Sequence, residues 1–128
     1  MSLRSPLGAV LGTGAARGAV HHWWVQRVSA VALVPLGLWL LISLLSLPLG
    51  DYVAVVNWVA RGWNPVLLVL LIGAAAWHSR LGVQVVIEDY VHGAGLKTAS
   101  LLLSAGAHLL VAALGIYAVL RIALRSIG

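Results

Sequence analysis

The fold is decided by the apolar run that begins at Pro65 and closes with His78-Ser79-Arg80-Leu81-Gly82-Val83-Gln84-Val85-Val86-Ile87-Glu88-Asp89-Tyr90. Proline suits the first turn of a helix, where its missing N–H group costs nothing. The run is longer than the about 20 residues that a helix needs to cross a bilayer. We therefore predict a membrane-spanning helix with His78 inside it and with Asp89 and Tyr90 at its end. Ionisable groups in such positions usually serve a function.

The overall composition is that of a membrane protein. Hydrophobic residues make up 62% of the 128 residues, charged residues make up 9%, and the mean hydropathy is +1.03. Such a chain cannot cover a soluble globule of this size with polar groups, and no separate catalytic domain fits. The net charge of +5 comes from scattered basic residues, which we interpret as topology and headgroup charges rather than a nucleic-acid surface. Cysteine is absent, which excludes iron–sulfur ligation by this chain.

Two further apolar runs complete the prediction of an all-α membrane protein with three spanning helices, at about residues 28–49, 65–88 and 98–120. Residues 1–27 are expected to form a loosely ordered N-terminal surface segment. The segment from Gly50 to Pro65 has the composition of an interfacial loop or short surface helix. The sequence His92-Gly93-Ala94-Gly95-Leu96-Lys97 predicts the turn before the third helix. Residues 1–128 would thus form one domain.

The basic residues give a weak indication of orientation. One side of the membrane would carry Arg4, Arg17, Arg27, Arg80 and Lys97, and the other would carry Arg61, Arg121 and Arg125. The positive-inside rule therefore favours a cytoplasmic N-terminus by a small margin.

His78 lies among small neighbours, with Ala74 and Ala75 one turn before it and Gly82 one turn after it. Such neighbours leave room for a bulky flat group, and a neutral imidazole can ligate haem iron when the macrocycle can approach the helix. Small residues also allow neighbouring membrane helices to pack closely. The pattern alone leaves both interpretations open.

The pair Asp89 and Tyr90 has two explanations as well. A tyrosine beside solvated acids is a common interfacial anchor. Alternatively, a phenol near a carboxylate can donate a hydrogen bond to a carbonyl-bearing ligand that enters from the lipid, such as a quinone.

The order of His78, Gly82 and Asp89-Tyr90 resembles the hydrophobic membrane-anchor subunit of succinate dehydrogenase, respiratory complex II. The stretch from His78 to His92 is most similar to the alphaproteobacterial and mitochondrial-like branch. A second match is His21-His22-Trp23-Trp24-Val25-Gln26-Arg27-Val28-Ser29-Ala30, because the family has a histidine and an arginine six residues apart before its first span. The three-helix plan and the chain length agree with this resemblance.

The resemblance implies half of a two-subunit anchor that binds a b-type haem and forms a ubiquinone site. It assigns His78 as one axial ligand of the haem iron, and it matches Arg27 and His21 to positions that meet the haem propionates. It assigns Tyr90 as the hydrogen-bond donor to the quinone, with Asp89 beside it. Arg27 also has a simpler explanation, a positive-inside charge at the start of a helix.

The resemblance also implies the partners and the location. A cytochrome b556-type anchor subunit would supply the second haem ligand, and FAD and iron–sulfur clusters would lie only in a flavoprotein subunit and an iron–sulfur subunit. The chain would catalyse nothing alone, would contact lipid and no nucleic acid, and would be a multi-pass protein of the bacterial inner membrane.

Three matters stay open at the level of sequence. His108, in the third span, is either a rival haem ligand or a histidine that joins two helices. The same architecture could serve as a menaquinone-linked fumarate reductase anchor. A non-redox structural membrane protein, whose histidines only join helices, is the alternative from a different class.

Overall fold

The computed structural model describes residues 15–125, apart from the side chains of residues 15–19, 21 and 22. In this part of the chain four helices follow one another: α2 (Ala15–Ser46), α3 (Tyr52–Ala60), α4 (Asn64–Tyr90) and α5 (Ala94–Arg125). The described residues contain no strand. Three segments are long and apolar enough to cross a membrane, namely Trp23–Ser46, Asn64–Tyr90 and Ala94–Arg125. The predicted all-α fold with three spanning helices is confirmed.

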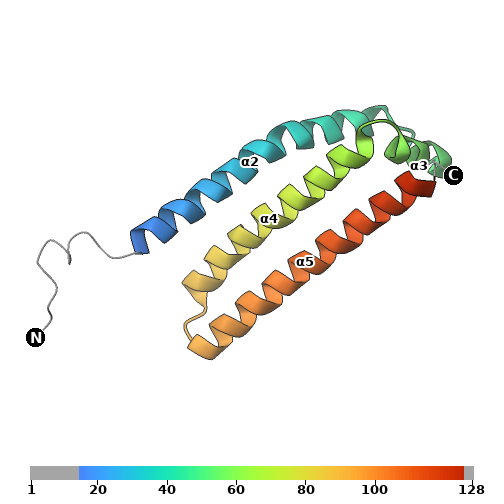
Figure 1. The fold of residues 1–128 in the computed structure, drawn as a ribbon. Helices are drawn as coiled ribbons and strands as arrows, with labels where there is room; N and C mark the ends of the chain where they lie inside the picture. Colours follow the sequence, from blue (N-terminus) through green and yellow to red (C-terminus); the bar gives the residue numbers. More distant parts are fainter. Residues whose placement is uncertain (1–14, 126–128) are drawn as a thin grey trace, which may run out of the picture.

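The three long helices lie in a row with α4 in the middle (Figure 1). α4 packs against α2 on one flank and against α5 on the other, and α2 and α5 do not pack against each other within residues 15–125. Only Leu81 and Val119 are buried among the described hydrophobic residues, at 7% and 8% exposure. A row of helices has no enclosed centre, so most apolar side chains face outward. Lipid and other protein chains are the surroundings that suit such a surface.

The first helix begins nearer the N-terminus than we predicted from the sequence. We expected a tail over residues 1–27, whereas α2 begins at Ala15. No proline occurs between Ala15 and Val34, so no residue in this part lacks the N–H group that a helix uses. α2 ends at Ser46, two residues before Pro48, in keeping with the steric clash that proline imposes on a preceding helical residue.

The segment between the first two spans is a short helix, one of the two forms expected from its composition. Asp51 caps α3, because its Oδ1 accepts hydrogen bonds from the backbone N–H groups of Val53 and Ala54 at 2.9 and 3.1 Å. The ring of Trp58 stacks on that of Trp39 in α2, with centroids 5.6 Å apart. These contacts hold α3 at the end of the bundle where α2 leads into α4.

The turn between α4 and α5 is shorter than predicted. We expected a turn over residues 92–97, but α5 already begins at Ala94. The Nζ of Lys97 donates to the carbonyl oxygen of Glu88 at 2.9 Å, one of the carbonyls that the end of α4 leaves without a helical partner. This link lets α5 start close to the end of α4, and a long loop is not needed.

The α4–α5 seam is tight at Gly115. A Cβ at this position would lie 3.3 Å from Cδ1 of Ile72 in α4, whereas a Cβ at Gly106 of the same helix would meet nothing within 4 Å. Gly115 therefore allows α4 and α5 to approach, while Gly106 faces open space.

We expect Gly115→Leu to lower stability by about 1–3 kcal/mol more than Gly106→Leu, because only the first substitution forces a side chain into a packed seam. Thermal unfolding of the two variants in detergent measures the difference. Equal unfolding temperatures would show that the seam does not constrain residue 115.

Candidate functional site

His78 is a half-buried residue of α4 that faces α2. Its Nδ1 lies 3.1 Å from the Oγ of Ser29, which is 49 positions away in the sequence. Beside this contact is an open groove of about 410 Å³, lined by Trp23, Gln26, Arg27, Ala30 and His78. We call it the α2–α4 groove. The structure therefore gives the predicted haem ligand a solvent- or ligand-accessible space on one side.

Arg27 lines the same groove as His78. Its guanidinium lies over the ring of Trp23, 4.6 Å from the ring centroid, and the side chain is exposed. A cation over an aromatic face is attracted by the ring quadrupole, so Trp23 holds the guanidinium at this rim. The predicted ligand and the predicted propionate-binding cation thus come together, from α4 and α2.

The chemistry of the groove suits a metal-bearing group with acidic substituents. A neutral imidazole can ligate iron, and a guanidinium can pair with carboxylates through two parallel hydrogen bonds. Within residues 15–125 there is no cluster of three or more His, Asp or Glu side chains that could hold a metal ion alone. The side chain of His21, the other predicted propionate contact, lies outside the described residues.

Asp89 and Tyr90 lie away from the α2–α4 groove, at the end of α4. Tyr90 follows His78 by three and a third turns, which is about 18 Å along the helix axis. Both side chains are exposed, Tyr90 to 78%, and in the described part of the chain no hydrogen bond to either side chain is found. Their neighbour Glu88 is engaged instead, because its Oε1 accepts from Nε2 of Gln84 at 2.8 Å. The two predicted halves of the site are therefore separate places on one helix.

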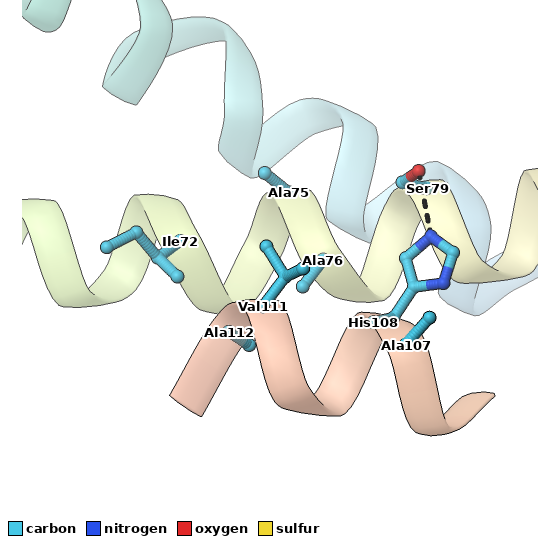
Figure 2. Close-up of a pocket in the computed structure, with 8 residues that line it drawn as sticks. All are labelled: Ile72, Ala75, Ala76, Ser79, Ala107, His108, Val111 and Ala112. Atoms are coloured by element: carbon cyan, nitrogen blue, oxygen red, sulfur yellow. Dashed lines mark hydrogen bonds between the residues drawn. The ribbon is translucent and has the colours of Figure 1, made fainter. Parts of the chain in front are cut away.

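His108 of α5 bonds through both ring nitrogens, once within its own helix and once to Ser79 of α4, the contact drawn in Figure 2. Its Nδ1 lies 2.7 Å from the carbonyl oxygen of Ser104, and a carbonyl oxygen only accepts, so Nδ1 carries the hydrogen. Its Nε2 lies 3.1 Å from the Oγ of Ser79 and then accepts the serine hydrogen. Of the two interpretations that the sequence left open, the helix-joining one fits the contact from Nε2 to Ser79 of α4.

Ala75, which the sequence places one turn before His78, does not line the α2–α4 groove. It lines an apolar groove of about 440 Å³ on the α5 side, together with Ala76, Ala107 and Ala112 (Figure 2). In the α2–α4 groove the small neighbour is Ala30, which α2 contributes.

Three residues of the site were not assigned roles from the sequence. Trp23 and Gln26 line the α2–α4 groove, and Ser29 contacts His78. Ser29 is one of three serines in the first predicted span and lies two positions after Arg27, and that placement is the signal that could have drawn attention to it. Its partner could not be known before α2 and α4 were seen to pack.

The chain is similar to known membrane anchor subunits of succinate dehydrogenase. The chain is 38% identical over 79 residues to the succinate dehydrogenase hydrophobic membrane anchor subunit of Rickettsia bellii (strain RML369-C), covering 62% of this chain and 63% of the relative. It is 32% identical over 80 residues to the protein of that name from Rickettsia conorii (strain ATCC VR-613 / Malish 7), covering 62% and 64%. It is 35% identical over 86 residues to the succinate dehydrogenase membrane anchor subunit of Reclinomonas americana, covering 64% and 71%.

The matched part thus spans a little under two thirds of the length of the two Rickettsia relatives. The model of the succinate dehydrogenase/fumarate reductase transmembrane subunit family matches residues 1–120, which is nearly the whole chain and includes both α2 and α4. The resemblance indicated by His78 and Asp89-Tyr90 is confirmed, and the chain belongs to the succinate dehydrogenase/fumarate reductase transmembrane subunit family.

Proposed function

We propose that this chain is the hydrophobic membrane anchor subunit of a succinate:ubiquinone oxidoreductase. In this role it holds a flavoprotein subunit and an iron–sulfur subunit on the membrane, contributes one axial ligand to a haem b and forms part of the ubiquinone site. The observation that carries the proposal is the α2–α4 groove, where His78 and Arg27 meet from two different helices. The names of the similar proteins support the same role.

The groove has the chemistry that haem b needs. The His78 imidazole would ligate the iron, and the Arg27 guanidinium, already oriented over Trp23, would pair with a propionate. His21 would be a second propionate contact. Bound there, haem b supplies one-electron chemistry. Since one described histidine lines the groove, we infer that the second axial ligand comes from a cytochrome b556-type partner subunit.

The C-terminal end of α4 would form part of the quinone site. The phenol of Tyr90 donates a hydrogen bond to a quinone carbonyl, and the carboxylate of Asp89 orients the ligand or passes protons to it. Both groups are exposed and, among residues 15–125, without side-chain partners, so they are open to contacts from other subunits. A site closed by those subunits excludes water, which strengthens the hydrogen bond from Tyr90.

The location follows from the helices and their charges. We propose a multi-pass protein of the bacterial inner membrane with a cytoplasmic N-terminus. The start of α2, the end of α4 and the start of α5 lie at one end of the row (Figure 1). Tyr90 would then lie at the cytoplasmic side, where soluble subunits can bind. Succinate oxidation itself belongs to those subunits.

We expect His78→Ala to abolish the b-type haem bands of the purified complex, because it removes an axial ligand. His108→Ala is the matched control, since this histidine also lies mid-helix but both its nitrogens bond within the chain. A reduced-minus-oxidised visible spectrum gives the answer. Haem bands that persist in His78→Ala, or that vanish only in His108→Ala, would refute the ligand assignment. A native complex without haem bands would favour a non-redox structural protein.

We expect Tyr90→Phe to lower quinone reductase activity on the order of tenfold, the effect of losing one hydrogen bond of about 1.4 kcal/mol. Succinate oxidation with a soluble acceptor should stay nearly unchanged. Tyr117→Phe, an exposed tyrosine on α5, is the control and should change neither rate. Parallel loss of both activities in Tyr90→Phe would indicate an assembly defect. Identifying the quinone extracted from the complex distinguishes the proposed succinate dehydrogenase anchor from a fumarate reductase anchor, because menaquinone would indicate the second.

A further inference from the structure

The Ser29 hydroxyl lies within hydrogen-bonding distance of a carbonyl oxygen and of an imidazole nitrogen. Its Oγ is 2.8 Å from the backbone carbonyl oxygen of Gln26, one turn earlier in α2, and 3.1 Å from Nδ1 of His78 in α4. A carbonyl oxygen can only accept a hydrogen bond, so the bond to Gln26 uses the one hydrogen of the serine hydroxyl. Serine hydroxyls within helices commonly bond to the backbone in this way.

The second contact of Ser29, to His78, then determines which ring nitrogen of His78 carries a hydrogen. With its own hydrogen committed to Gln26, the Ser29 oxygen can only accept from the imidazole. Nδ1 of His78 must carry the hydrogen, and in a neutral imidazole Nε2 then carries the lone pair. Among the described residues no hydrogen bond to Nε2 is found, so this lone pair is available to a ligand.

We propose that Ser29 is a positioning residue for His78: its hydroxyl oxygen accepts the Nδ1 hydrogen and so presents Nε2, unprotonated, to the haem iron. This inference rests on the proposed function of His78 as a haem ligand and extends it to α2. When the non-ligating ring nitrogen of a histidine donates its hydrogen to an acceptor, that bond fixes the tautomer and the orientation of the ring. It also makes the ligating nitrogen more basic.

A more basic axial ligand stabilises oxidised iron over reduced iron, because oxidised iron carries the greater positive charge. The contact from Ser29 therefore holds the haem potential below the value it would have without an acceptor. The contrast with His108 supports this interpretation. That histidine also donates from Nδ1, but its Nε2 is occupied by Ser79 and offers no lone pair.

The test compares Ser29→Thr with Ser29→Val in the purified, assembled complex. Threonine and valine have nearly the same shape, so the pair differs in the hydroxyl and not in the volume placed between α2 and α4. The readouts are haem content, the midpoint potential from a redox titration and the electron paramagnetic resonance spectrum of the oxidised haem. Ser43→Val is the control, because Ser43 makes the same kind of helix-internal bond, to Trp39 at 2.8 Å, in the same helix.

We expect Ser29→Thr and Ser43→Val to keep the native potential and spectrum. Ser29→Val should shift the potential to a more positive value and alter the spectrum, or lose haem that Ser29→Thr retains. Equal potentials and spectra for Ser29→Val and the native complex, a negative shift, or haem loss in Ser29→Thr and Ser29→Val alike would overturn the inference. These outcomes concern Ser29 alone, since failure of the haem assignment itself appears separately, as haem bands that survive His78→Ala.

Discussion

Two adjacent residues of α4 each contact a different neighbouring helix. His78 contacts Ser29 of α2 at 3.1 Å, and Ser79 contacts His108 of α5 at the same distance. Successive residues point about 100° apart around a helix, so the two contacts fix how α4 is rotated between its neighbours. In a membrane, where apolar packing between helices has no hydrophobic driving force, such polar contacts and close packing of small residues hold helices together.

This rotation decides which residues can form a site. Once His78 faces α2, the groove beside it is completed by Trp23, Gln26, Arg27 and Ala30, all from that helix. Ala75 and Ala76 line a separate apolar groove, together with residues of α5. The positive charge of Arg27 and the imidazole of His78 therefore share one space, while the alanines next to His78 in sequence do not enter it.

The row of helices also explains why the chain resembles half of a larger assembly. Among its described apolar residues only Leu81 and Val119 are buried, many are exposed, as Leu45 is to 80%, and α2 and α5 do not close around α4. One histidine of the described part of the chain lines the groove. Asp89 and Tyr90 stand about 17 and 18 Å further along α4, without partners among the described side chains. Both proposed functions, haem ligation and quinone binding, need groups that another chain would bring.

The sequence by itself determined the helical class, the three spans and the residues of interest, because apolar runs of this length have one stable form in lipid. It also placed His78, Asp89 and Tyr90 on one helix. Only the tertiary structure decided where α2 starts, how short the turn before α5 is, and which residues contact His78 and His108. Periodicity gives the direction of a side chain around its own helix, but which neighbour it meets depends on how the helices pack, and only that packing brings Ser29 and Arg27 to His78.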